Sequence, residues 1–511
     1  MKIYDVIIIG SGLAALTAAK RLSSTKNVII FTKSGSKDSN SYQAQGGVAA
    51  AIAGEDHWEQ HFTDTMKAGA YHNIPNHLEQ LTKQGAGMIA ELMEAGMEFD
   101  REKGGNLDLA QEGGHLRRRI LHAGGDATGK GLISFMLERL KDRVSIIENE
   151  VGADLIMENG RCIGVWTKRK NGEIRQYFAP TTIIATGGCG WVYTYTSNDP
   201  TITGDGIAMA YRAGAELTDM EFVQFHPTLL YKGGKTIGLV SEALRGEGAF
   251  LQNRIGQRIM EGVHELTDLA PRDIVARTVF KEIQKGREVF LNISHVKNFS
   301  RRFPTIHWLC TRHGLHRDGH LLPVTPGAHF LIGGIKANDY GETSVKGLYA
   351  VGEAACTGVH GANRIASNSL LEALVFGNQT AERILEDGTQ HSFSICTRSD
   401  GPSISNILPD KQEIRDKMSE KVGVVRNHQD LRDMKDWLEQ FEFLHVNQLS
   451  LSEEQMEVRN MLTVSWLITT SAIKREESLG SHFRSDFPFT LKKQGRKEFI
   501  RHISEKTMAA I

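Results

Sequence analysis

The sequence predicts an α/β fold built on a parallel sheet and followed by a helical bundle. A continuous apolar strand, a glycine turn and a helix follow one another in residues 4–23. Two apolar strands that end in glycine return far downstream, in residues 181–193 and 346–361. Beyond residue 410 the apolar residues recur at helical spacing. At 511 residues the chain is also longer than one ordinary domain, which favours two or three.

The composition argues against several classes of partner. The 60 Lys and Arg residues nearly balance the 61 Asp and Glu residues, so no overall field attracts nucleic acid or an anionic membrane. The five cysteines lack metal-binding spacing, and we expect no metal. The apolar run Val6–Ile9 is too short for a signal peptide, and no stretch approaches the roughly 18 apolar residues of a transmembrane helix. We therefore expect a soluble, cytoplasmic protein.

The N-terminal turn has the pattern of a dinucleotide-binding site. Residues 10–15 read Gly-Ser-Gly-Leu-Ala-Ala after a strand and at the start of a helix. The first glycine allows the tight turn, the second lets backbone N–H groups approach a pyrophosphate, and the small third residue packs the helix against its strand. We assign to the cofactor Gly10, Ser11, Gly12, Leu13, Ala14 and Ala15.

The next strand, in residues 27–34, lacks the acidic residue that usually holds the ribose hydroxyls at its tip. Thr32 and Lys33 stand there instead. Lys33 has two interpretations: it lies beside a diphosphate or adenosine group, or it is a solvated loop lysine. The missing acid argues against a simple NAD-dependent dehydrogenase.

Five cationic side chains lie in Gly- and Pro-rich surroundings further along the chain. They are His226, Arg245, Arg272, His329 and Arg364. A substrate with two carboxylates calls for such a set, because Arg binds a carboxylate with two parallel hydrogen bonds and His adds directional ones. Taken singly, a His is more often a core or loop residue whose hydrogen bonds are made within the protein. A single Arg is more often part of a surface ion pair. The prediction therefore depends on the whole set.

These residues lie in stretches that resemble the succinate dehydrogenase/fumarate reductase flavoprotein family. The matching stretches include Gln-Phe-His-Pro-Thr, Arg-Gly-Glu-Gly and Gly-Ala-Asn-Arg, and the resemblance covers residues 3–385. It implies FAD as the cofactor. It also implies a split Rossmann-like FAD-binding domain with an inserted α+β capping domain and a C-terminal helical bundle. The expected bounds are 1–218 and 331–400 for the FAD-binding domain, 219–330 for the capping domain and 401–511 for the helical domain, with a linker at 398–410.

The resemblance assigns further residues to the site. To the cofactor it assigns Lys33, Asn40, Ser41, Tyr42, Gln43, Ala44, Gln45, Gly46, Gly47, Asp205, Glu353, Ser369 and Leu370. To the substrate it assigns Glu112, His226, Ser241, Glu242, Arg245, His329 and Arg364. Backbone N–H groups of residues 45–47 are expected at the flavin ring edge, where negative charge grows on reduction.

The family contains respiratory flavoproteins, which interconvert succinate and fumarate, and a soluble branch that oxidises L-aspartate. Residues 111–132 and 475–488 resemble the second branch, and Ala366-Ser367 stands where respiratory subunits more often read Gly-Ala. Glu112 would then meet the α-ammonium group that aspartate has and succinate lacks. The alternative for Glu112 is a solvated loop acid.

The resemblance also bears on the flavin linkage and the chemistry. Asn40 stands where respiratory flavoproteins carry the histidine that bonds covalently to the flavin, so we expect noncovalent FAD. The implied reaction is oxidation of L-aspartate to iminoaspartate, with a hydride passing to flavin N5, as the first step of NAD biosynthesis through quinolinate. Oxygen, giving hydrogen peroxide, or fumarate is the expected acceptor. Arg272 matches the family's proton-transfer arginine, either with a lowered pKa beside Arg245 or by relay to Glu242 or Asp273.

Two rival interpretations stay open at this stage. One is a soluble fumarate reductase or succinate-oxidising subunit, which would not release ammonia from aspartate. The other is a non-catalytic flavin-binding or assembly protein, which would not need the substrate arginines. A quinolinate synthase is a candidate partner for receiving iminoaspartate.

Overall fold

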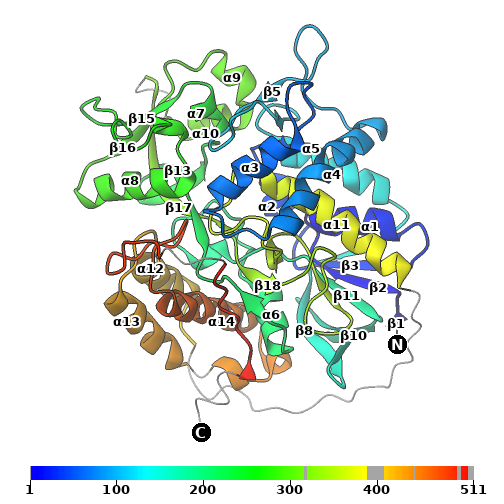
Figure 1. Ribbon diagram of the computed structural model, residues 1–511. Helices are drawn as coiled ribbons and strands as arrows, with labels where there is room; N and C mark the ends of the chain where they lie inside the picture. The colour runs from blue at the N-terminus through cyan, green and yellow to red at the C-terminus, as the bar shows by residue number, and fades with distance from the viewer. Residues whose placement is uncertain (1, 316–318, 388–407, 442, 492–495, 505–511) are drawn as a thin grey trace.

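The computed structural model describes residues 2–315, 319–387, 408–441, 443–491 and 496–504. Figure 1 shows three parts: a parallel-sheet domain on the right, a second sheet domain at the upper left and a group of helices at the lower left. The fold class is the one that the sequence predicts.

A five-stranded parallel sheet organises the first domain. Its strands, in spatial order, are β19(Leu348–Ala350), β11(Thr181–Ile184), β2(Val6–Ile9), β3(Val28–Thr32) and β7(Ser145–Glu148). The N-terminal strand and the two distant glycine-ended strands therefore lie side by side. Every residue of β2 and β3 is buried, as is typical of parallel strands covered on both faces.

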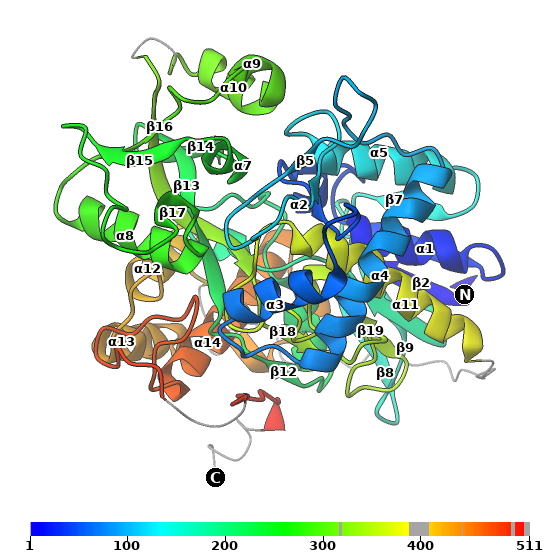
Figure 2. The same ribbon diagram turned by 45° about the horizontal axis from the view of Figure 1, so that its top comes forward.

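The two faces of this sheet are covered differently. Val6, Ile8 and Ile30 pack against helices, whereas Ile7 and Phe31 pack against a second sheet. The covering helices are α1(Leu13–Leu22), α3(Trp58–Ala68), α4(Pro75–Glu94), α5(Thr128–Leu140) and α11(Asn368–Glu386). Figure 2 shows α1, α4 and α11 together on this side. The second sheet has the order β1(Lys2–Ile3), β10(Ile174–Phe178), β9(Arg161–Arg169), β8(Glu150–Glu158).

Short elements complete this domain around the strand ends. They are α2(Asn40–Gln43), β4(Val48–Ala49), β5(Leu109–Ala110), β6(Ile120–Leu121), η1(Gly190–Val192), α6(Asp205–Arg212), β12(Leu217–Thr218), β18(Gly334–Lys336), η3(Gly352–Ala354) and β20(Ala355–Cys356). Helix α2 lies in a polar stretch that has no apolar residues at helical spacing. It begins because the Ser39 side chain accepts a hydrogen bond from the Tyr42 backbone N–H.

A five-stranded antiparallel sheet builds the inserted part. Its order is β14(Lys235–Leu239), β13(Val223–Lys232), β17(Leu321–Leu331), β16(Val289–Asn292), β15(Phe250–Asn253). The accompanying helices are α7(Ala243–Gly246), η2(Thr267–Leu269), α8(Arg272–Gln284), α9(Phe299–Arg302) and α10(Pro304–Arg312). We call this part the capping domain, and the boundaries at 219 and 330 stay predictions. The Asp126 carboxylate, from the first domain, accepts hydrogen bonds from two backbone N–H groups at the start of α10.

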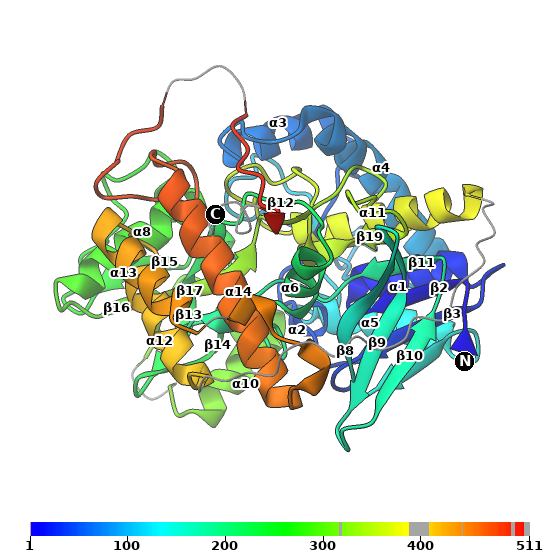
Figure 3. The ribbon, with the colours of Figure 1, turned by 90° about the horizontal axis from the view of Figure 1, so that it is seen from below.

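The C-terminal part is helical, as its apolar spacing predicted. It consists of α12(Lys411–Lys421), α13(His428–Glu439), η4(Phe443–His445), η5(Gln448–Ser450) and α14(Glu453–Lys474). Ile414, Met418 and Leu431 are buried between these helices. Figure 3 shows α14 running alongside α6 of the first domain. Of the predicted linker at 398–410, only residues 408–410 belong to the described residues.

The segment after α14 packs close to the capping sheet. Arg475 and Arg484 are buried, and the Arg475 guanidinium pairs with the Glu221 carboxylate at 2.5 Å. Leu479 packs with a cluster that contains Phe330, a residue of β17. Side chains of this C-terminal segment therefore pack directly against a side chain of β17.

Candidate active site

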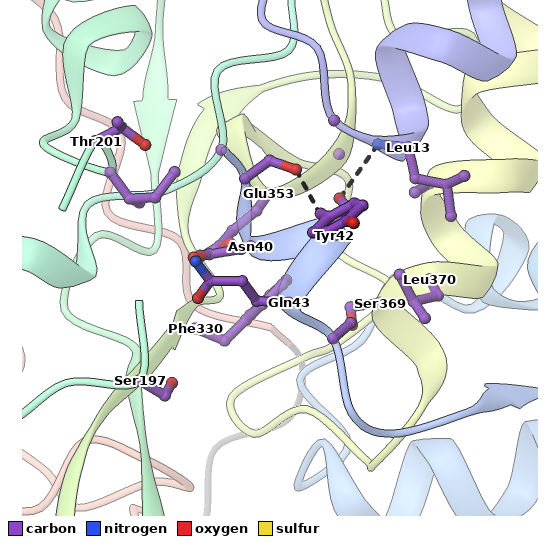
Figure 4. Close-up of a pocket in the computed structure, with 18 of the residues that line it drawn as sticks. Leu13, Asn40, Tyr42, Gln43, Ser197, Thr201, Phe330, Glu353, Ser369 and Leu370 are labelled. Carbon is purple, nitrogen blue, oxygen red and sulfur yellow. Dashed lines mark hydrogen bonds between the residues drawn. The ribbon is translucent and has the colours of Figure 1, made fainter. Parts of the chain in front are cut away.

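One cavity of about 660 Å³ lies where the parallel sheet, its loops and the capping domain meet. Figure 4 shows the convergence of distant segments: Leu13 from the start of α1, Tyr42 from α2, Glu353 from η3 and Ser369 from α11 surround the same space. Of the residues assigned from the sequence, all line this cavity except Ala15 and Arg245. Ala15 is fully buried in the core, which fits the packing role of the third residue in the turn.

The N-terminal turn forms one wall of the cavity. Gly10 has φ +110°, and a Cβ there would lie 2.2 Å from the Ala185 carbonyl oxygen. The Leu13 backbone N–H at the start of α1 donates to Ser41 Oγ at 3.2 Å. The positive end of the α1 dipole, which points at the cavity from this turn, suits a pyrophosphate.

Lys33 is not a solvated loop lysine. Its Nζ donates to Asp205 at 2.6 Å, to Glu457 at 2.9 Å and to Thr203 Oγ1 at 2.8 Å. Burial lowers the pKa of Lys33, but the carboxylates of Asp205 and Glu457 outweigh it, so that the net pKa is raised. Lys33 is therefore a charged member of the cavity wall.

The segment 39–47 forms another wall. The Asn40 side-chain amide donates to Asn198 Oδ1 at 2.7 Å, and its oxygen accepts from the Asp199 backbone N–H at 2.9 Å. Gln45 is buried, and its Oε1 has no hydrogen-bond partner within the described ranges. A Cβ at Gly47 would lie 2.2 Å from the Leu121 carbonyl oxygen, so this glycine is required by packing against β6.

Glu353 lies deep in the cavity at the end of β19. Its Oε1 accepts a hydrogen bond from the Leu331 backbone N–H at 3.0 Å. Burial raises the pKa of Glu353 to about 7, although this hydrogen bond opposes the shift. The carboxyl group is thus poised between its neutral and charged forms near neutral pH.

The opposite end of the cavity is cationic. His226 and His329 lie with ring centroids 5.0 Å apart, and Ser197 Oγ and His329 Nδ1 lie 2.6 Å apart. Burial, with Arg272 nearby, holds the pKa of both histidines well below 6.5, so both rings are neutral. Arg364 stacks on the Phe330 ring at 4.4 Å, and burial lowers the pKa of Arg364 to about 9.

A buried ion-pair network fixes the arginine next to these rings. The Glu242 carboxylate accepts from Arg272 Nε and from an Arg245 terminal nitrogen, each at 2.6 Å. Arg272 also donates to Gln224 Oε1 at 3.1 Å. Arg245 therefore acts behind the wall rather than on it, while Asp273 pairs with Arg277 at 2.9 Å. Glu242 is the carboxylate beside Arg272.

Glu112 supplies a negative charge on the same cavity wall. It is 2 % exposed, so it is not a solvated loop acid. Its Oε2 accepts a hydrogen bond from Ser367 Oγ at 2.6 Å. Its Oε1 has no hydrogen-bond partner in the described part of the chain and lies 3.8 Å from His122 Nε2.

Several lining residues were not assigned from the sequence. They include Ser197, Phe330 and Ser367. Gln224, which accepts a hydrogen bond from Arg272, was not assigned either and does not itself line the cavity. Gln224 and Ser367 lie inside the motifs that carried the family resemblance, where their polar side chains were a usable signal. Phe330 follows His329 in another of these motifs, but its apolar side chain gave no signal of a binding role, and Ser197 lies outside them. The place of both residues depends on pairing between β13, β17 and the loop before α6.

The described residues contain no cluster of three or more His, Cys, Asp or Glu side chains placed to hold a metal ion. In the same residues, no helix combines the length and the apolar character needed to cross a bilayer.

Comparison with known proteins identifies the cofactor. The family model described as an FAD binding domain matches residues 5–370, and the model of the fumarate reductase flavoprotein C-terminus matches residues 411–507. The cavity fits this group: it offers a glycine turn at a helix N-terminus, a charged lysine and the unpartnered amide oxygen of Gln45. FAD is therefore the cofactor of the cavity.

Relatives that match over nearly the whole chain show which branch of the family the chain belongs to. The chain is 46 % identical to the L-aspartate oxidase of Bacillus subtilis, with 94 % of this chain and 91 % of the relative covered. It is 37 % identical to the chloroplastic L-aspartate oxidase of Arabidopsis thaliana, with 96 % and 82 % covered. A quinol fumarate reductase structure from E. coli superposes with a TM-score of 0.86 at 26 % identity, with 98 % and 94 % covered. The chain belongs to the L-aspartate oxidases, FAD-dependent oxidoreductases of the succinate dehydrogenase/fumarate reductase flavoprotein family.

Proposed function

We propose that this protein oxidises L-aspartate to iminoaspartate. The observation that carries the proposal is the charge pattern of the cavity. A buried carboxylate with a free oxygen, Glu112, shares the wall with Arg272 and Arg364. A dicarboxylate that also bears an ammonium group complements this pattern, whereas succinate leaves Glu112 without a partner. An unpaired buried charge is costly, which favours the aminated substrate.

The two arginines and the two histidines at one end of the cavity hold the two carboxylates. Arg364 and Arg272 each offer guanidinium N–H groups, and the neutral rings of His226 and His329 each offer one N–H. FAD held by the residues of the glycine turn and of segment 39–47 would supply the acceptor for the hydride that leaves the substrate α-carbon, with oxygen, giving hydrogen peroxide, or fumarate as the final electron acceptor. Holding the α-carbon in reach can contribute roughly 7 kcal/mol or more to the rate.

The chain must also accept the proton that leaves the substrate nitrogen. Arg272 is the assigned proton-transfer residue, and an arginine is a weak base. Glu242, hydrogen-bonded to Arg272 Nε at 2.6 Å, supports a relay from Arg272 to Glu242. Asp273 does not support one, because its carboxylate pairs with Arg277. Arg272→Lys is expected to collapse turnover while the flavin absorbance stays.

Asn40 supports noncovalent binding of FAD. Its amide is held by Asn198 and Asp199, and an amide carries no imidazole nitrogen for a flavin bond. On this proposal the reaction is the first step of NAD biosynthesis through quinolinate, and a quinolinate synthase is the expected consumer of iminoaspartate.

An anaerobic titration tests the function. Acid denaturation of the purified protein is expected to release yellow flavin into the supernatant. L-Aspartate is then expected to bleach the flavin of the native protein, with ammonia appearing on hydrolysis of the product, whereas succinate is not. Bleaching by succinate but not by aspartate would overturn the proposal in favour of a succinate-oxidising enzyme. Bleaching by neither would favour a binding protein.

A further inference from the structure

Ser367 occupies an unusual backbone position beside the cavity. It precedes α11 with φ +62° and ψ +3°, a left-handed conformation that is uncommon for a residue other than glycine. Such a conformation persists only where its surroundings enforce it, and it often marks a functional site. The side chain is 6 % exposed and lines the cavity.

Buried hydrogen bonds on both sides enforce this conformation. The Ser367 carbonyl oxygen accepts from the Ala49 backbone N–H at 3.1 Å. The preceding carbonyl, of Ala366, accepts from His115 Nε2 at 2.9 Å. On the other side, Oδ1 of Asn368 lies 2.8 Å from Nε2 of His61.

The protonation of His115 follows from its neighbours. Burial lowers the pKa of His115 to about 4, so the ring is neutral and carries one proton. Arg119 lies 3.3 Å from His115 Nδ1 and has only N–H donors, which places the ring proton on Nε2. His115 can therefore donate to the Ala366 carbonyl. Arg119 is itself fully buried and fixed by Asp56 and Asp64.

The enforced backbone aims the Ser367 hydroxyl at one oxygen of Glu112. Oγ lies 2.6 Å from Oε2 of that carboxylate. The other oxygen, Oε1, is left without a hydrogen-bond partner among the residues that the structure describes. A Cβ at Gly46 would lie 3.7 Å from this Oε1, and Gly46 lines the cavity too. The free oxygen is thus beside the wall assigned to the flavin.

We infer that Ser367 is a specificity-determining positioning residue: by holding Glu112 Oε2 it keeps Oε1 directed at the ammonium group of the substrate. This inference rests on the proposed oxidation of L-aspartate. Without the hydroxyl, the carboxylate can turn about its last bonds and take either oxygen away from the ammonium position. A ligand that has the two carboxylates but no ammonium group does not depend on this orientation.

Variants of Ser367 and Glu112, each purified with FAD, test the inference with two ligands. Succinate binding is followed by the change in flavin absorbance, and turnover of L-aspartate gives kcat/KM. Ser367→Ala is expected to lower kcat/KM for L-aspartate by about tenfold or more, the size expected for a hydrogen bond to a charged group. The succinate Kd is expected to change by less than about twofold. Ser471→Ala, which removes a buried hydroxyl of α14 that does not line the cavity, is the matched control and is expected to change neither value.

A second variant and a double variant separate orientation from folding. Ser367→Gly is expected to behave like Ser367→Ala, because glycine adopts a φ of +62° without strain. In an E112Q background, Ser367→Ala is expected to add less than about a twofold loss, since Ser367 acts through Glu112.

The outcomes distinguish the two proposals. The role of Ser367 would be overturned if Ser367→Ala weakened succinate binding by the same factor as it lowered kcat/KM for L-aspartate. It would also be overturned if the losses in kcat/KM of the two single variants multiplied in the double variant. A normal kcat/KM for L-aspartate in Ser367→Ala, together with an impaired E112Q variant, would also overturn the role of Ser367. The proposed oxidation of L-aspartate would not be affected by that result. Normal kcat/KM in E112Q would overturn the ammonium role of Glu112 and this inference with it.

Discussion

Replacing Glu242 by Gln removes one buried negative charge between two buried positive ones. Its oxygens accept from Arg245 and Arg272, each at 2.6 Å, and the three side chains are 1 %, 0 % and 8 % exposed. Breaking a buried ion pair by removing one partner costs about 3–5 kcal/mol, because the remaining charge is left in a low-dielectric site. We expect the free energy of unfolding of the E242Q variant, measured by urea denaturation followed by circular dichroism, to fall by about that amount.

A surface variant and a pH series supply the controls. Glu282→Gln breaks pairs with Lys285 and Arg287, whose side chains are 56 % and 54 % exposed, and should cost less than about 1 kcal/mol. Burial raises the pKa of Glu242, but the two arginines outweigh it, and the net pKa lies below the ordinary 4.5. The stability from this carboxylate is therefore fully present above pH 4.5 and is lost as the pH falls through its lower folded-state pKa. Equal unfolding free energies for the E242Q and E282Q variants at neutral pH would refute the reasoning.

Three further outcomes are expected. Gly10→Ala should yield protein with little bound FAD, seen as a low ratio of flavin to protein absorbance, because the new Cβ would lie 2.2 Å from a carbonyl oxygen; normal FAD content would contradict this. Asp126→Ala removes the cap of α10 and should cost about 1 kcal/mol there, so limited proteolysis should cut near α10 faster than in the wild type; an unchanged cleavage pattern would count against the cap. His226 and His329 stay neutral in the fold, so protons bind the unfolded state first. As the pH falls below 6.5, the unfolding free energy should decrease by about 1.4 kcal/mol per pH unit for each of the two rings. The variant with Ala at both positions is the control, and its unfolding free energy should decrease less over the same pH range.

The sequence predicted the parts of the fold that depend on local pattern. The strand, turn and helix of residues 4–23 appear as β2 and α1, and the helical spacing beyond residue 410 appears as α12, α13 and α14. Apolar spacing also located the buried residues of α12, such as Ile414 and Met418. Local periodicity cannot locate α2, because its start depends on one side-chain cap rather than on an apolar face.

The site could be predicted only as far as its motifs reach. His226, Arg272 and Arg364 lie in recognisable stretches and all line the cavity. Arg245 lies in such a stretch too, yet it reaches the wall only through Glu242. Arg245 is kept off the wall by the packing of α7 against η2, where the Asp268 carbonyl oxygen accepts a hydrogen bond from the Arg245 guanidinium at 2.5 Å. Contacts between segments far apart in the chain decide such cases, and no local pattern encodes them.

Lys33 shows how such distant contacts decide the cofactor end. The strand tip that precedes it lacks the expected acid, but the structure brings two carboxylates to the Lys33 ammonium group, Asp205 from α6 and Glu457 from α14. Asn460, one turn further along α14, donates to Asp205 Oδ1 at 2.8 Å. The helical domain thereby holds Lys33 and Asp205, two of the charged residues of the cavity wall. The capping domain supplies His226 and Arg272 at the other end of the cavity. The FAD-binding and capping domains therefore line the cavity together, while the helical domain contacts two of its lining residues through Glu457 and Asn460.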